Sequence, residues 1–530
     1  MCGEGGQTYL RRSTALSKYW TGETARLPIG TWKSAKGIVK PGAFPDEGPN
    51  GARKGLKARV IKRLTLVGEQ QQKSQYSLVF DEDDKGEAPK GHDEGTEAPP
   101  ATDTSERPAD DEDLMEKVCE PANIQAALKH VMRNKGAPGA DGMAVEDLSA
   151  HLETHWPAIR NRLLAGTYRP QPVRRVEIPK PGGGGVRKLG IPTALDRLIQ
   201  QAVLQVIQPR WDGTFSDNSF GFRPGRSAHQ AIARAQSYIE QGLGYVVDID
   251  LEKFFDKVNH DILMSLVAKR ESDKRLLKLI RSFLTAGIME NGLVTRNEEG
   301  TPQGGPLSPI LSNLMLDVLD RELESRKLHF VRYADDCNIY VSSLRAGERV
   351  MDSIKGFLTK KLKLKVNPEK SAVGKPSKRK FLGFSFQVTR DTVKRRLAPK
   401  TIERYKERIR DITGRNRGIS LAKMTVELAR YINGWRGYFG FCETPSVLRR
   451  LEQWTRRRFR LVAWKQWKTG RRRFTELANR GAPPALAAPA AGSSLGPWRI
   501  SRSLPLHIAL DNASLAKLGL PYLLEPLPSA

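Results

Sequence analysis

The chain has 530 residues, a formal net charge of +29 and a pI of about 10.0. This length predicts several domains, and so large a one-signed charge favours a polyanionic partner, either nucleic acid or a membrane surface. No apolar run is long enough to cross a bilayer, no signal peptide is recognisable, and the four cysteines form neither a metal spacing nor a disulfide framework, so we expect a reducing cytoplasm.

Residues 1–112 differ in composition from the rest of the chain. The first part is basic and rich in Gly, whereas residues 81–113 are acidic and rich in Pro. Such a segment cannot bury enough apolar surface to offset the entropy lost on ordering. We therefore predict a disordered extension, which is either a functional basic arm or a translated upstream region without function.

Order is predicted to begin near Asp113, with helices on both sides of a glycine-rich break at residues 136–142. Next, two β-prone runs flank the glycines of residues 182–185, which predicts a basic hairpin. Lys180 and Arg187 of this hairpin can neutralise a phosphate, although a solvated hairpin has the same pattern.

An acidic strand is predicted at residues 245–250. Its alternation places Tyr245, Val247 and Ile249 on one face and Val246, Asp248 and Asp250 on the other. Asp250 stands at the end of the strand, where a carboxylate is costly to bury unless it is paired or bound to a metal.

A second acidic element is the predicted hairpin at residues 331–341, with Asp335 and Asp336 at its tip. Adjacent carboxylates repel each other, and a divalent cation removes that cost. Oxygen ligands without neighbouring His favour magnesium. Two strands that each end in carboxylate can hold two cations for in-line phosphoryl transfer, whereas an isolated pair is usually a solvated turn.

Two further loops contain candidate ligand contacts. Residues 219–226 include Arg223, which can contact nucleic acid or form a structural ion pair. Residues 300–309 form a turn before a helix, in which Gly304 and Gly305 permit close approach of a nucleic-acid strand and Gln303 offers an amide donor and acceptor.

From residue 397 the chain is predicted to be helical and strongly basic. On a helical wheel the apolar face contains Val447, Leu451 and Trp454. The opposite face contains Arg449, Arg456 and Arg460, which favours contact with an RNA or DNA backbone over an ordinary solvated face. The Pro, Ala and Gly of residues 481–497 predict that residues 481–530 are a linker and a tail.

Three motifs occur in the order seen in reverse transcriptases. They are Asp250 with Phe254-Phe255, the segment of residues 300–309, and Tyr333-Ala334-Asp335-Asp336. The sequence resembles a bacterial group II intron-encoded reverse transcriptase, or maturase, over about residues 114–525, and most resembles the compact group IIC type without an endonuclease domain. The resemblance implies an α+β right-hand polymerase, with fingers and palm around a small antiparallel sheet in residues 113–396 and an α-helical thumb or maturase domain in residues 397–480.

The resemblance also implies roles for individual residues. Asp250 and Asp335 would bridge two Mg²⁺ ions with secondary support from Asp336, and Lys180 and Arg187 would grip the triphosphate. Further nucleotide contacts would come from Phe255, Gln303 and Lys370. Phe255 would exclude ribonucleotides, although either residue of the Phe254-Phe255 pair can be the one that faces the sugar.

The implied function is RNA-directed DNA synthesis combined with binding of the intron RNA to assist its splicing and mobility. The expected partners are group II intron RNA, an RNA template with a DNA primer, deoxynucleoside triphosphates and target DNA, in the bacterial cytoplasm within a ribonucleoprotein or at the nucleoid. The alternatives are a splicing cofactor without polymerase activity and a reverse transcriptase repurposed for defence or repair.

Overall fold

The structure is a computed structural model that describes residues 113–179, 186–290, 292–295, 297, 299–301 and 304–524. The predicted disordered extension, Lys180 and Gln303 lie outside the described residues. The chain divides into two compact units, of which the first comprises the described residues up to Phe215 together with Lys253–Met315, and the second comprises Ser216–Glu252 and the residues from Leu316 onward. No helix in the described part of the chain is long and apolar enough to cross a bilayer.

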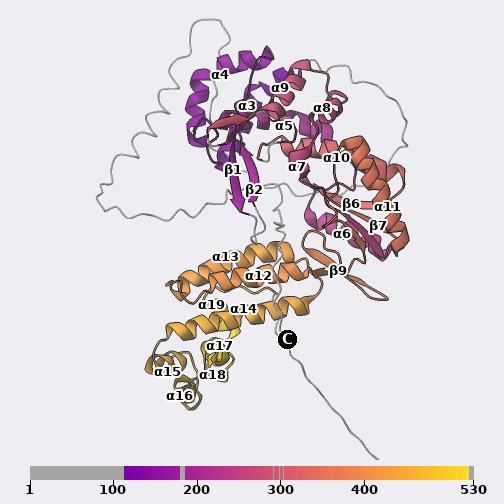
Figure 1. Cartoon of the computed structure of the whole chain (residues 1–530). Helices are drawn as coiled ribbons and strands as arrows, with labels where there is room; N and C mark the ends of the chain where they lie inside the picture. Colours follow the sequence, from indigo (N-terminus) through magenta and orange to yellow (C-terminus); the bar gives the residue numbers. More distant parts are fainter. Residues whose placement is uncertain are drawn as a thin grey trace, which may run out of the picture. The chain divides into compact units, whose positions relative to one another are not determined.

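The first unit is mainly helical. Its helices are α2 (Leu114–Val118), α3 (Pro121–Asn134), α4 (Leu148–Leu164), α5 (Ala194–Asp212), α7 (Phe254–Lys257), α8 (His260–Ala268) and α9 (Lys274–Thr285), with a 3₁₀ turn at Val145–Asp147. Helix α3 begins at a proline and packs against α5, near which it lies in Figure 1. Helix α5 is capped by Thr193, whose hydroxyl accepts a hydrogen bond from the Asp196 amide.

The sheet of the first unit contains the predicted basic hairpin. Strand β1 (Val173–Pro179) pairs antiparallel with β2 (Val186–Ile191) on one side and parallel with β4 (Ile288–Glu290) on the other, and β4 pairs with β5 (Leu293–Thr295). The register opposes Arg175 to Gly190 and Ile178 to Arg187. This register decides which hairpin side chains share a face.

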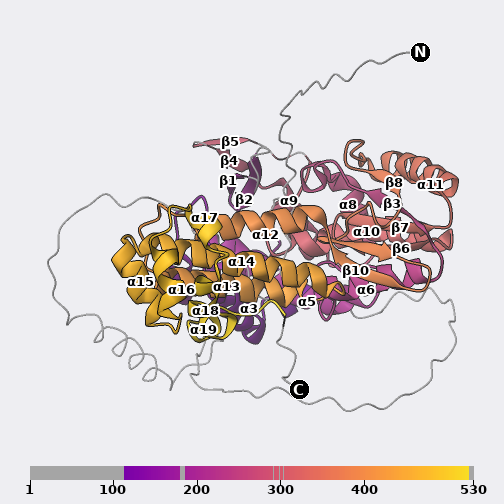
Figure 2. The ribbon, with the colours of Figure 1, turned by 90° about the horizontal axis from the view of Figure 1, so that it is seen from below.

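The second unit contains a four-stranded sheet in the order β6 (His329–Tyr333), β7 (Asp336–Val341), β3 (Tyr245–Ile249) and β8 (Ala372–Gly374), with antiparallel pairs throughout. Helix α11 (Leu344–Phe357) packs on β3, β7 and β8, and Figure 2 shows it beside them. Helix α6 (Ala228–Glu240) packs on β6 and joins Val246 and Tyr340 in the core. The predicted α+β class is confirmed.

The C-terminal part of the second unit is helical, as predicted. A hairpin of β9 (Phe384–Val388) and β10 (Val393–Leu397) leads into three long helices that lie side by side in Figures 1 and 2. These are α12 (Pro399–Ile412), α13 (Leu421–Phe439) and α14 (Pro445–Gln466). Tyr405 is fully buried between them and its hydroxyl lies 3.0 Å from that of Thr455.

The prediction of a linker and tail at residues 481–530 is wrong for the described residues to 524. After α15 (Gly470–Ala478), the chain forms α16 (Pro484–Ala491), α17 (Pro497–Ile500), α18 (Leu504–Ala509) and α19 (Asn512–Lys517). Ala487, Ile500, Leu506 and Leu515 of these helices are buried in the same core as α13 and α14. Pro484 and Pro497 begin α16 and α17, where no amide hydrogen is needed.

Candidate active site

The predicted catalytic carboxylates meet at one edge of the second unit's sheet. Ile249, the last residue of β3, pairs with Cys337 of β7. In this register Asp250 follows β3 at the position where Asp336 begins β7, and Asp335 stands in the turn that joins β6 to β7. All three carboxylates are partly exposed. Two strands far apart in the sequence therefore place their acidic ends side by side.

A buried ion pair holds the β6–β7 turn. Arg332 and Asp320, which lies on α10 (Ser308–Ser325), are both fully buried and 2.5 Å apart. The remaining guanidinium nitrogen of Arg332 donates to the carbonyl of Ala334 at 3.0 Å. Burial alone would lower the pKa of Arg332, but the Asp320 carboxylate raises it above its ordinary value. The charged guanidinium of Arg332 therefore holds the β6–β7 turn in place through the Ala334 carbonyl.

The loop that contains Gly221 holds the same turn from the side. The Phe220 amide donates to the Arg332 carbonyl at 2.9 Å. A Cβ at Gly221 would lie 2.2 Å from the backbone nitrogen of Ala334, which itself adopts a left-handed φ of 57°. Glycine is therefore required here because the two backbones touch. The function of this loop as a support for the catalytic turn was not evident from the sequence.

Arg223 belongs to the same loop, and its predicted contact with nucleic acid does not agree with its burial. It is 4% exposed and donates to the carbonyls of Ser216 and Ser219 at 2.7 and 3.1 Å. The structural alternative is the one that the contacts support, because the guanidinium closes the loop on itself.

Two cationic side chains neutralise the carboxylates of β3. Lys370 lies 3.2 Å from Asp250, and Arg379 lies 2.7 Å from Asp248. Arg379 also donates to the carbonyl of Lys370 at 2.9 Å, so it ties the Lys370 loop to the strand. Asp248, which was left out of the predicted site, is accordingly a structural partner.

The residues at this edge fit a hard divalent cation. No three His, Cys, Asp or Glu side chains of the described residues converge into a ready-made ligand group. The oxygen-only donor set of Asp250, Asp335 and Asp336 is nevertheless the kind that magnesium prefers when substrate phosphates complete its shell. The ammonium group beside Asp250 also shows that positive charge is stable there.

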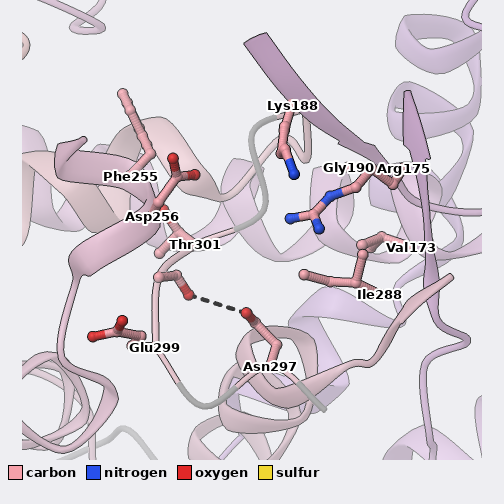
Figure 3. Close-up of a pocket in the computed structure, with 11 residues that line it drawn as sticks. Val173, Arg175, Lys188, Gly190, Phe255, Asp256, Ile288, Asn297, Glu299 and Thr301 are labelled. Carbon is pink, nitrogen blue, oxygen red and sulfur yellow. Dashed lines mark hydrogen bonds between the residues drawn. The ribbon is translucent and has the colours of Figure 1, made fainter. Parts of the chain in front are cut away.

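A pocket of about 100 Å³ lies in the first unit against Phe255 (Figure 3). Phe254 is 2% exposed and belongs to the core, whereas Phe255 lines the pocket. The other lining residues include Val173, Arg175, Lys188, Gly190, Asp256, Asn297, Glu299 and Thr301. The pair therefore divides as adjacent residues usually do, with Phe254 buried and Phe255 accessible.

The hairpin cations that face this pocket differ from the predicted ones. Arg175 and Lys188 point into it (Figure 3), whereas Arg187 is the neighbour of Lys188 and lies on the other face of β2. Arg175 also lies 3.1 Å from Glu290. Because alternate residues of a strand share a face, Arg175 could have been predicted to lie on the same face as Val173. The pairing of β1 with β2, which places Lys188 on that face too, is decided by the tertiary structure.

Gly304 and Gly305 are close to the protein's own chain. A Cβ at Gly304, whose φ is +143°, would lie 2.6 Å from the carbonyl oxygen of Gly190, and one at Gly305 would lie 2.4 Å from the amide oxygen of Gln200. The positive φ and the contact with the Gly190 backbone account for Gly304 without an approach of nucleic acid, whereas the atoms nearest to Gly305 belong to the end of the Gln200 side chain.

The predicted cationic face of α14 is wrong at two of its three positions. Arg456 and Arg460 are 2% and 4% exposed, and they donate to the carbonyls of Asn512 and Leu510. Burial lowers the pKa of Arg460 to about 10. Arg449 alone of the three is exposed. The helices after residue 481 cover the face that a wheel of α14 presents as cationic.

Two protein families match the chain in succession. The family described as reverse transcriptase (RNA-dependent DNA polymerase) matches residues 178–386. The family described as group II intron, maturase-specific domain, matches residues 402–481. The first match includes Asp250, Asp335 and Asp336, and the second covers most of α12 and all of α13 and α14.

Three curated relatives are similar to parts of this chain. Protein YkfC of Escherichia coli is 34% identical over 300 residues, which are 49% of this chain and 78% of that protein. The group II intron-encoded protein LtrA of Lactococcus lactis is 30% identical over 335 residues, which are 51% of this chain and 56% of LtrA. The putative COX1/OXI3 intron 2 protein of Saccharomyces cerevisiae is 29% identical over 42% of this chain and 33% of its own length. With Asp250, Asp335 and Asp336 at one sheet edge and the maturase-specific helices following them in the chain, the chain belongs to the bacterial group II intron-encoded reverse transcriptases with a maturase domain.

Proposed function

We propose that this RNA-directed DNA polymerase copies its own group II intron RNA from a primer at a DNA target and also binds that RNA to assist its splicing. The observation that supports this most is the meeting of Asp250, Asp335 and Asp336 at the ends of β3 and β7. The group IIC subtype, and a place in the bacterial cytoplasm within a ribonucleoprotein, are parts of the same proposal.

Asp250, Asp335 and Asp336 would hold two magnesium ions, which supply activation of the primer 3′-hydroxyl and stabilisation of the leaving pyrophosphate when bound. The primer hydroxyl loses its proton and attacks the α-phosphate of the deoxynucleotide, and the bond to pyrophosphate breaks. Within the chain, Arg332 holds the turn that carries two of the carboxylates. Arg379 holds the loop of Lys370, whose ammonium lies at the same edge and can contact substrate phosphate.

Primer extension tests this function directly. The assay contains a DNA primer on an RNA template, deoxynucleotides and magnesium, with a parallel reaction that lacks the metal. We expect metal-dependent extension and binding of intron RNA in a gel-shift experiment. Binding of the RNA without any extension would instead identify the chain as a splicing cofactor.

Removal of residues 1–112 is expected to leave primer extension near its full rate, because the composition of this segment predicts no contact with a core. The comparison is between the full chain and a chain that begins at Asp113, at equal concentrations. Aggregation or loss of extension by the shortened protein would show that the segment is structural or functional.

Phe255 is expected to exclude ribonucleotides. A ring against the sugar leaves no room for a 2′-hydroxyl, and overpacking costs about 1–3 kcal/mol, or roughly ten- to a hundredfold in discrimination. The measurement is the ratio of kcat/KM for a deoxynucleotide and its ribonucleotide, which should fall by that factor in Phe255→Ala.

Phe254→Ala is the matched control for this prediction. Because Phe254 is buried, its replacement by alanine should lower the free energy of unfolding by about 3–5 kcal/mol. The ratio of kcat/KM for deoxynucleotide and ribonucleotide, measured on the protein that remains folded, should not change. If Phe254→Ala collapses the ratio and Phe255→Ala keeps it, the sugar contact belongs to Phe254.

A further inference from the structure

The main-chain segment Gly300–Thr301 lies directly against the turn that contains Phe255. The Thr301 amide donates to the Phe255 carbonyl at 2.6 Å, and the Gly300 amide donates to the Val258 carbonyl at 2.7 Å. Gly300 has a φ of +91°, and a Cβ there would lie 2.8 Å from the Phe255 carbonyl oxygen. The position of the Phe255 backbone is therefore coupled to that of Gly300.

Two side chains in turn hold Gly300. His260, which is 5% exposed, has its Nε2 atom 2.6 Å from the Gly300 carbonyl oxygen. Because a carbonyl only accepts, Nε2 carries the proton. The Asn297 amide donates to the same carbonyl at 3.3 Å (dashed in Figure 3). It also donates to the Leu284 carbonyl at 2.9 Å. One carbonyl oxygen thus receives two side-chain donors from different parts of the first unit.

We infer that His260 and Asn297 are positioning residues for sugar selection by the polymerase. They fix Gly300, Gly300–Thr301 fixes the Phe255 carbonyl, and the ring of Phe255 then stays at one height beneath the incoming sugar. Discrimination against a ribonucleotide depends on a clash with one hydroxyl, so a small movement of the ring is enough to relieve it. This inference rests on the proposed contact of Phe255 with the sugar.

A purely structural role for His260 makes a different prediction. A histidine that only stabilises the fold changes the melting temperature and the amount of active protein, but it leaves the ratio between two substrates of the same active site unchanged. The ratio of kcat/KM for deoxynucleotide and ribonucleotide therefore separates the two roles.

The experiment compares His260→Phe, which keeps a ring but removes the donor, with His260→Gln, which keeps a side-chain N–H. Asn297→Ala is the second test variant. We expect His260→Phe and Asn297→Ala to lower the ratio about three- to tenfold, the effect of about one lost hydrogen bond, with deoxynucleotide extension largely kept. His260→Gln should recover part of the ratio.

Asn259→Ala is the control, because Asn259 caps α8 by accepting from the Ile262 amide, whereas the side-chain donors to Gly300 described above are His260 and Asn297. It should lower the melting temperature and leave the ratio unchanged. A ratio unchanged in both His260→Phe and Asn297→Ala, or lowered equally in Asn259→Ala, would overturn the inference.

Combination with Phe255→Ala distinguishes failure of this inference from failure of the proposed sugar contact. If the donors act through Phe255, His260→Phe should add no further loss of discrimination in the Phe255→Ala background. An unchanged ratio in Phe255→Ala itself would overturn the sugar contact and the inference together. A collapsed ratio there, combined with a normal ratio in His260→Phe and Asn297→Ala, would overturn the inference alone.

Discussion

Replacement of Asp335 by alanine is expected to abolish DNA synthesis. Asp335 stands in the β6–β7 turn beside Asp336, and Asp250 ends the neighbouring strand, so the variant loses one of three carboxylates from the same sheet edge. Loss of a shared metal ligand should lower the rate by about 10³-fold or more, which corresponds to ~4 kcal/mol of transition-state stabilisation. The measurement is single-turnover extension of a DNA primer on an RNA template with magnesium.

Binding of the intron RNA should persist in the same variant, because the substitution removes only one partly exposed carboxylate and leaves the helical domain intact. Asp352→Ala is a matched control, since Asp352 is an exposed aspartate on α11. It should extend primers like the unchanged protein. Extension by Asp335→Ala at the rate of this control would refute the assignment of the catalytic carboxylates.

Replacement of Arg332 by methionine is expected to damage stability and activity together. The Asp320 carboxylate would remain fully buried without its ion-pair partner, and breaking one side of a buried pair costs about 3–5 kcal/mol. That is a large part of a typical unfolding free energy of about 5–15 kcal/mol. Thermal or denaturant unfolding of the purified variant measures the loss.

A double variant, Arg332→Met with Asp320→Leu, separates the two consequences. Replacing a buried ion pair by apolar side chains of similar size is often neutral, so most of the stability should return. The Ala334 carbonyl still lacks its donor, so extension should stay well below that of the unchanged protein. Full activity in the double variant would show that Arg332 does not position the catalytic turn.

Arg321→Met provides the control for a surface charge. Arg321 is 55% exposed and lies 3.2 Å from Glu324 and 3.6 Å from Asp317; because the Arg321 charge itself faces water, its loss should cost about 0–1 kcal/mol. A loss of stability as large as that of Arg332→Met would mean that burial is not the cause. Comparison of the buried Arg332 with the exposed Arg321 thus tests whether burial of the ion pair causes the loss of stability.

The positions of the three predicted catalytic carboxylates at strand ends could be predicted from the sequence because their signal is local. Asp250 directly follows a β-branched strand, Asp335 stands in the short turn of a hairpin, and Asp336 begins the second strand of that hairpin. Period-two alternation decides which side chains share a face, so the environment of each strand end follows from a few neighbouring residues. The division of Phe254 and Phe255 between core and pocket has a different local cause, because both lie in the short helix α7, where successive side chains point about 100° apart.

The roles of the arginines could not be obtained in this way. A helical wheel of α14 places Arg456 and Arg460 on a cationic face, yet the carbonyls of Asn512 and Leu510 accept their hydrogen bonds. Composition had predicted a tail for the segment that supplies these carbonyls. Periodicity describes one helix at a time and contains no information about a segment that returns to cover it.

The sequence by itself therefore determined the strand ends, the acidic turn and the order of the two family domains, since each depends on residues close together in the chain. Tertiary structure alone decided that Arg332 and Gly221 support the catalytic turn, and that Arg175 and Lys188 face the pocket in place of Arg187. These outcomes depend on contacts between segments that are far apart in the sequence. A buried charge is stable only where a carbonyl or carboxylate from such a segment forms a hydrogen bond or an ion pair with it.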